Sequence, residues 1–390
     1  MKSKINIMLF SFVFIALIFC NKTKAQSTQS LLYGKLTTVQ GNTYQGVIRW
    51  GSEEAIWLNV FNAVKIRNSY NKYLRSSHRH FTNHYFNCYF GDIKSIEKVN
   101  HYKVTIGIKK DNKYIQVNNS SNDIGTDIWI CDNEIGHMKI GWRNFKKVEF
   151  MDTPINLECK FGYPIWGTVR TYSNNLYTGF ITWDKDERLS TDKLDGQTED
   201  GEVSIQFKNI KKIAKNFGSC KVVLNSGREM KVKNSNDVDY RNKGIVIDIP
   251  DMGRVELDWK EFRAVEFDND HKSKATYTSF KSPSRIWGNV KTHSGEEYRG
   301  IVIYDIDESM NFEHLDGETY EAEYNIPFRN IKAIRPLDYN HMEIQLKNGK
   351  IVTLGNSQDT SNKNDGILIF MSKEDYIYVP IKKVSEIILE

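Results

Sequence analysis

Two short loops of the chain are crowded with acidic residues whose spacing repeats. Carboxylate oxygens at alternate positions are ligands for Ca²⁺, which takes six to eight oxygens. The loops do not match an EF-hand, because the glycine and the final glutamate are not at the required spacing. Asp and Gly also form ordinary turns, and we prefer that interpretation, which requires no cofactor, with bound Ca²⁺ as the alternative. The candidate ligands are Asp184, Asp186 and Asp195 in the first loop and Asp305, Asp307 and Asp316 in the second.

A histidine-rich stretch offers a different metal chemistry. His78, His80, His84 and Cys88 are spaced so that a strand would place them on one face. Imidazole and thiolate groups bind zinc or copper. A tetrahedral site needs ligands that converge, which one straight strand cannot provide. A basic loop without a metal is therefore the preferred interpretation, and a metal site at the three histidines is the alternative.

Tryptophans recur beside alternating apolar residues, as Trp166, Trp183, Trp259 and Trp287. Aromatic side chains that recur in this way usually pack in a core. An exposed platform on which a glycan stacks is the alternative. The chain contains no GxSxG, HExxH, Walker or GxGxxG context. We therefore expect that the protein is not an enzyme.

The elements that must position these residues are repeated. Residues 166–196 read WGTVRTYSNNLYTGFITWDKDERLSTDKLDG, and residues 287–317 read WGNVKTHSGEEYRGIVIYDIDESMNFEHLDG. A third, more divergent copy begins at Tyr33. Within each copy apolar residues alternate, step by three, and alternate again, as at Ile205, Phe207 and Ile210. Alternation predicts a strand with one buried face, and the step of three predicts a single 3₁₀ turn.

We therefore predict an all-β fold of tandem small five-stranded SH3-like barrels, two per repeat and three repeats. Such barrels end in a strand, a 3₁₀ turn and a further strand. Glycines within the returning strands, namely Gly46, Gly179 and Gly300, predict a bulge or a sharp bend. The predicted boundaries are residues 1–25 for a signal peptide, 26–150 for module 1 with a His-rich insertion at 67–91, 151–268 for module 2, 269–284 for a linker and 285–390 for module 3.

The pattern resembles SH3-like and Sm-like small β-barrels, and more closely a repeat of uncharacterised exported bacterial proteins. The signature of that repeat is WGxVxTxxGxxYxGxIxWDxDExxxxDxLDG, followed by IxFxxI, NDV…NxGI and WxxFxxVxF. Here these segments lie at residues 166–196, 205–210, 236–245 and 259–267. Module 1 departs from it, because residues 51–54 read GSEE and the LDG is missing. The resemblance implies an architecture and no particular activity.

The N-terminus has the form of a signal peptide. Lys2 and Lys4 precede an apolar run at residues 5–19 that is short for a membrane span. We predict cleavage after Ala25, with a lipoprotein acylated at Cys20 as the alternative. No later stretch is long and apolar enough to cross a bilayer. Removal of residues 1–25 takes four lysines and no acid from a formal charge of +5, so the basicity predicts no nucleic-acid partner.

Four cysteines remain after that cleavage, Cys88, Cys131, Cys159 and Cys220, without CxxC spacing. We expect small buried hydrophobic groups or one disulfide, which an exported chain can form. The whole pattern predicts a non-catalytic exported repeat protein of the periplasm or cell surface. Its expected role is binding or scaffolding at the cell envelope, with an envelope protein or a glycan as partner. The alternatives are a metal-dependent factor or enzyme that uses the His-rich insertion, and a glycan-binding module.

Overall fold

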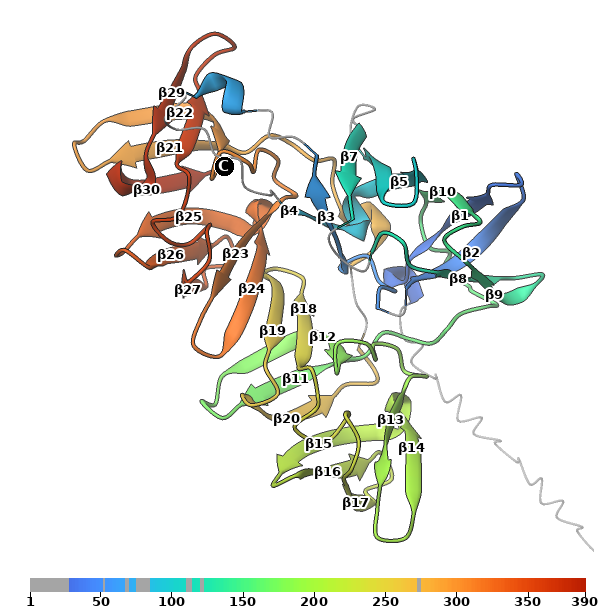
Figure 1. Ribbon diagram of the computed structural model, residues 1–390. Coiled ribbons are helices and arrows are strands. Elements are labelled where there is room, and N and C mark those ends of the chain that lie inside the picture. Colours follow the sequence, from blue (N-terminus) through green and yellow to red (C-terminus); the bar gives the residue numbers. More distant parts are fainter. Residues whose placement is uncertain are drawn as a thin grey trace, which may run out of the picture.

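The computed structural model describes residues 28–51, 53–66, 70–74, 85–109, 114–119, 123–271 and 275–390 (Figure 1). These residues form thirty β-strands joined by turns and short 3₁₀ segments, and they contain no α-helix. The predicted all-β class is therefore confirmed. In this described part of the chain, no helix is long and apolar enough to span a membrane. The predicted signal peptide with Cys20, and His78, His80 and His84, lie outside the described residues.

Module 1 pairs ten strands in one antiparallel sheet. Its first two and last three strands form a set of five, the flanking strands, in the order β10-β1-β2-β8-β9. The five strands between them in the chain, the nested strands, follow the order β4-β3-β7-β6-β5, and β5 pairs with β10. The elements are η1 (Thr28–Ser30), β1 (Tyr33–Thr38), β2 (Thr43–Trp50), β3 (Val60–Lys65), η2 (Asn71–Tyr73), β4 (Tyr85–Tyr89), η4 (Phe90–Asp92), β5 (Ile93–Lys98), β6 (Lys103–Ile108), β7 (Tyr114–Asn118), β8 (Ile128–Asp132), β9 (Gly136–Ile140) and β10 (Phe145–Phe150).

Modules 2 and 3 follow the same order, with strand numbers raised by ten and by twenty. In module 2 the link between β13 and the end of β17 is a single bridge, Gln197 to Lys233. The elements of module 2 are β11 (Trp166–Thr171), β12 (Leu176–Trp183), β13 (Lys193–Gln197), β14 (Glu202–Gln206), η5 (Phe207–Asn209), β15 (Ile210–Asn216), β16 (Ser219–Leu224), β17 (Glu229–Val232), β18 (Ile245–Ile249), β19 (Gly253–Leu257) and β20 (Phe262–Phe267). Those that follow are η6 (Tyr277–Ser279), β21 (Trp287–Thr292), β22 (Glu297–Ile303), β23 (His314–Glu318), β24 (Ala322–Pro327), η7 (Phe328–Asn330), β25 (Ile331–Pro336), β26 (His341–Leu346), β27 (Ile351–Gly355), β28 (Ile367–Phe370), β29 (Tyr376–Val379), η8 (Ile381–Lys383) and β30 (Val384–Leu389).

The predicted division of each repeat into two consecutive five-stranded barrels is wrong in its strand pairing. In module 2, β12 pairs with β18 and not with β13, and β11 pairs with β20. In the described residues, the strands form open sheets that do not close into barrels. The physical reason is that alternation fixes which face of a strand is buried, whereas the partner strand is chosen by packing across long sequence separations.

The predicted strand, 3₁₀ turn, strand sequence is present where the apolar spacing steps by three. Phe207 and Phe328 each begin a 3₁₀ turn that leads into β15 and β25, and both side chains are buried. Trp183 and Trp259 also lie in the core, as expected. Trp287 does not, because 43% of its surface is exposed. Trp166 is half-buried and stacks on the ring of His271.

The three glycines of the returning strands mark close backbone contacts, not bulges. A Cβ atom at Gly46 would lie 2.0 Å from the carbonyl oxygen of Cys131, and one at Gly300 would lie 2.2 Å from that of Phe370. The register shifts of these sheets occur at other positions. Glycine is required here because the neighbouring strand, β8 or β28, approaches too closely for any side chain.

The three modules are joined by strand pairing and side-chain packing. β19 of module 2 pairs with β24 of module 3, so one sheet runs through both modules (Figure 1). Residues 70–74 of the His-rich insertion lie against module 3, where η2 lies beside β29 (Figure 1) and Tyr73 packs on the rings of Phe370 and Tyr376. Leu74 is buried in a cluster with Ile306 and Leu368. This described part of the insertion is therefore packed in an interface between modules 1 and 3.

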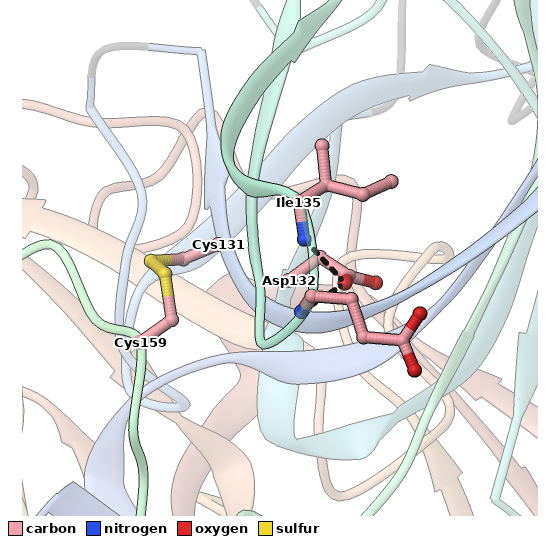
Figure 2. Close-up of a disulfide and its surroundings, with 5 residues drawn as sticks. Cys131, Asp132, Ile135 and Cys159 are labelled. Carbon is pink, nitrogen blue, oxygen red and sulfur yellow. Dashed lines mark hydrogen bonds between the residues drawn. A yellow bond between two sulfur atoms is a disulfide. The ribbon is translucent and has the colours of Figure 1, made fainter.

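A disulfide joins Cys131, in β8, to Cys159, in the segment that leads from module 1 to module 2 (Figure 2). Beside it, the carboxylate of Asp132 accepts hydrogen bonds from the backbone N–H groups of Glu134 and Ile135, which closes the β8–β9 turn. Cys88 and Cys220 are free and buried. The cysteines thus provide one disulfide and two buried thiols, the two kinds of role expected from their spacing.

Candidate functional site

A tight turn at the end of β22 gathers the acidic residues of module 3. Tyr304 and Glu308 exchange backbone hydrogen bonds of 2.8 and 2.9 Å. The two residues after Tyr304 adopt left-handed backbone conformations, with φ of 48° at Asp305 and 59° at Ile306. Such a conformation is strained for a β-branched residue. Burial of the Ile306 side chain in the cluster that includes Leu74 offsets this cost and fixes the direction of the neighbouring carboxylates.

A second loop, between β27 and β28, brings a further carboxylate to this turn. Gln358 donates a hydrogen bond of 2.8 Å from Nε2 to Oδ2 of Asp305. The hydroxyl of Tyr304 donates to the carbonyl oxygen of Asp359, and the side chain of Asp359 accepts the backbone N–H of Asp316. These bonds hold Asp359 beside Asp305 although the two residues are far apart in the sequence.

The two loops line a pocket of about 190 Å³. Carboxylate oxygens of Asp305, Glu308 and Asp359 lie within 4.8 Å of one another, and all three side chains are buried. Burial, and then the charges of the neighbouring carboxylates, hold the pKa of Glu308 and the pKa of Asp305 well above their usual values. The pocket is lined by Tyr85, Asn87, Asp305, Asp307, Glu308, Glu313, His314, Asp316, Ser357, Gln358 and Asp359.

Module 1 forms one wall of this pocket. Tyr85 and Asn87, from β4, line it. Lys65, the last residue of β3, forms ion pairs of 2.9 Å with Asp307 and 2.7 Å with Glu313. Burial opposes the charge of Lys65, but Glu313 and Asp307 outweigh it and raise its pKa. Among the described residues, no lysine or arginine forms an ion pair with Asp305 or Glu308.

A neutral histidine completes the inner wall. Asp316 accepts a hydrogen bond from Nδ2 of Asn325, which leaves Oδ1 of Asn325 to accept the Nδ1 proton of His314. Nε2 of His314 then carries the lone pair, and it is buried without a hydrogen-bond partner. Burial lowers the pKa of His314 to about 3, so the ring stays neutral. The pocket therefore offers acceptor atoms and a neutral imidazole beside its carboxylates.

Module 2 contains the equivalent loop, but its carboxylates are arranged differently. Asp184 is completely buried and accepts a hydrogen bond from Asn236, as Asp305 does from Gln358. Asp186 lies 3.7 Å from the ammonium group of Lys243. Asp195 donates its backbone N–H to the side chain of Asp237. In the described residues, the carboxylates of Asp184, Glu187 and Asp237 do not converge as their module 3 counterparts do.

The structure thus brings together three of the six predicted ligands, Asp305, Asp307 and Asp316. Asp359 was not among the ligands predicted from the sequence. The available signal was its recurrence, because Asp123 follows β7 and Asp237 follows β17 as Asp359 follows β27, and all three accept the same type of backbone hydrogen bond. A second group, Cys131, His137 and Cys159, is no metal site in this state, because its two sulfur atoms form the disulfide.

No known protein family, curated protein or solved structure matches the chain.

Proposed function

We propose that the protein is a non-catalytic exported β-repeat scaffold that binds a ligand at the cell envelope through the acidic pocket between modules 1 and 3. The main support for the proposal is a set of contacts between modules that one repeated residue position makes. Asn59, Asp192 and Glu313 occupy equivalent positions, since each accepts two backbone N–H groups of the loop before it. Each also contacts another module.

Those three contacts are specific and partly or fully buried. Asn59 donates a hydrogen bond of 3.0 Å to Asp248, and Arg49 binds both carboxylate oxygens of Asp192. Glu313 pairs with Lys65. One repeated residue position therefore serves as the joint between copies, which is what a rigid scaffold built from three copies of one unit needs. The same joint places β4 of module 1 over the pocket of module 3, where a ligand would meet two modules at once.

Export is supported by the disulfide between Cys131 and Cys159, because such bonds persist in oxidising compartments outside the cytosol. A binding role is supported by the chemistry of the pocket. Its carboxylates are held by hydrogen bonds from Gln358 and from backbone groups, so they are preorganised to receive a positively charged group. The proposal therefore has two supports, a disulfide typical of oxidising compartments and a preformed polar pocket.

Site-specific photo-crosslinking in intact cells tests this proposal. A photoreactive amino acid replaces Tyr85, which lines the pocket and is 62% exposed, and in a matched control it replaces Phe217, which is fully exposed in module 2. We expect an envelope-derived adduct at position 85, none at position 217, and a chain that begins at Gln26. Recovery in the cytosol with residues 1–25 attached, or equal labelling at both positions, would overturn the proposal.

A further inference from the structure

The deep end of the module 3 pocket contains acceptor atoms that have no partner. Glu308 is 7% exposed, and its Oε2 atom is buried without a hydrogen-bond partner. Leaving a buried charged oxygen unpaired costs free energy that a native fold normally avoids. The same side chain lines the pocket and is one of the three whose oxygens converge. An acidic cluster alone indicates no ligand, but this orphaned oxygen identifies an unfilled requirement for a positive group.

In the part of the chain that the structure describes, no lysine or arginine forms an ion pair with Glu308. Lys65 is held by Asp307 and Glu313 at the outer side of the cluster. Gln358 already donates to Asp305 through its amide nitrogen, which leaves its amide oxygen as a further acceptor in the lining. The inner site therefore presents carboxylate and amide oxygens, with a polar space of about 190 Å³ in which waters fit.

We propose that Asp305, Glu308 and Asp359 bind a hard divalent cation, with Ca²⁺ as the preferred ion. The three ligands are oxygens, which excludes a soft metal as the natural occupant. Two oxygens bound to one Ca²⁺ at 2.3–2.6 Å are at most about 5 Å apart, and the observed separations lie within 4.8 Å. Mg²⁺ demands a stricter octahedron than carboxylates from two separate loops provide.

The inference rests on the proposed function in one respect, because the cation would bind in the same pocket that we propose for the ligand. It also explains a difference between modules. Module 1 has Gly51 where module 3 has Asp305, and module 2 has three equivalent carboxylates that do not converge. We therefore expect one strong site per chain, and Glu187 of module 2 gives a matched control for Glu308.

Calorimetric titration of the purified chain from Gln26, dialysed against a chelator and then supplied with CaCl₂ or MgCl₂, tests the proposal. We expect one equivalent of Ca²⁺ to bind, a melting temperature that rises by several degrees, and Mg²⁺ to bind at least about tenfold more weakly. Glu308→Gln and Asp359→Asn should each weaken Ca²⁺ binding at least about tenfold, whereas Glu187→Gln should leave it unchanged.

Terbium luminescence gives a second measurement that does not depend on calorimetric heat. Tyr304 donates its hydroxyl hydrogen bond to Asp359, so its ring lies close enough to sensitise Tb³⁺ bound in the site. Tb³⁺ emission that Ca²⁺ displaces, and that Glu308→Gln abolishes, would support the inference. No heat, no thermal shift and no displaceable emission at 5 mM Ca²⁺, a concentration about fivefold above the weakest extracellular calcium dissociation constants, would overturn it. Equal effects of Glu308→Gln and Glu187→Gln would overturn the assignment to module 3, and equal affinity for Mg²⁺ would overturn the preference for calcium. None of these results bears on the crosslink at position 85, so the two proposals fail separately.

Discussion

Arg329 of module 3 binds both carboxylate oxygens of Asp92 of module 1, although the two residues are 237 positions apart. Asp92 is completely buried, and burial raises its pKa while Arg329 opposes that rise. A buried ion pair of this kind adds little net stability compared with apolar residues, but the loss of one partner leaves an uncompensated charge. The pair therefore makes correct docking of modules 1 and 3 a condition for folding.

Substitution of Arg329 by Met should lower the free energy of unfolding by about 3–5 kcal/mol, because Asp92 would remain buried without its partner. The double variant Asp92→Leu, Arg329→Met should recover most of that loss. Urea unfolding followed by tryptophan fluorescence measures both. Lys212→Met is the control, since its ion pair with Glu266 is exposed and contributes less than about 1 kcal/mol. A double variant as unstable as Arg329→Met would contradict the electrostatic explanation.

The insertion of module 1 should be required for the stability of module 3. Leu74 is 5% exposed and packs against Ile303, Ile306 and Leu368. Leu74→Ala should cost about 2–4 kcal/mol, because it leaves a cavity beneath the strained turn at Ile306. Denaturant unfolding measures the loss, and Leu337→Ala, at a 54% exposed position, should change stability by no more than about 0.5 kcal/mol. A neutral effect of Leu74→Ala would mean that the insertion is dispensable for folding.

The sequence could predict which faces of the strands are buried, but not which strands pair. Alternation at Phe207 and Phe328 reports local burial, and both residues lie in the core. The pairing of β12 with β18 joins two strands that are separated in the sequence by the whole nested set. Local periodicity contains no information about such a long-range partner. Exposure of Trp287 was missed for a related reason, because a strand at a module boundary meets solvent where its equivalent in another module meets protein.

The candidate site was predictable only in part, for the same reason. Asp305 and Asp307 lie on one turn, so their proximity follows from spacing. Asp359 joins them because the nested strands return the chain to β28, beside β22. Lys65 and Asn87 come from a different module, and no local pattern indicates that they face this loop. These parts of the pocket depend on how the strands pair and how the modules dock, so local sequence patterns could not predict them.

The disulfide should contribute to stability through the unfolded chain. Cys131 and Cys159 close a loop of 28 residues, for which loop-closure entropy predicts a loss of about 3–4 kcal/mol on reduction. Thiol titration of the denatured chain from Gln26 should find two free groups, Cys88 and Cys220, before reduction and four after it. The variant Cys131→Ser, Cys159→Ser is the control, since reductant should not change its unfolding curve. Four free thiols in the exported protein would contradict the bond and weaken the case for export.

Module 1 should lose stability as the pH rises through the range in which Asp123 ionises. Burial, opposed by hydrogen bonds from Asn62 and reinforced by the charge of Glu53, raises the pKa of Asp123 to about 6. Glu54 lies beside it, and burial followed by the charge of Asp123 raises its pKa as well. The folded chain therefore binds more protons than the unfolded chain between pH 4 and 6, so the free energy of unfolding falls as pH rises across that window.

Asp123→Asn should flatten this pH dependence, by up to about 3 kcal/mol between pH 4 and 7, because the amide does not ionise. Its Oδ1 atom can still accept the backbone N–H of Asn62, which the carboxylate accepts at 2.6 Å. Asp132→Asn is the control of opposite sign. Hydrogen bonds from Glu134 and Gln45 lower the pKa of Asp132, so its contribution to stability is present above its unfolded pKa and is lost as pH falls. Urea unfolding between pH 4 and 7 measures the Asp123 slope, and further points below pH 4 measure the slope that Asp132 contributes. A wild-type stability that rises between pH 4 and 6, with an unchanged slope in Asp123→Asn, would show that Asp123 is ionised in the folded protein throughout.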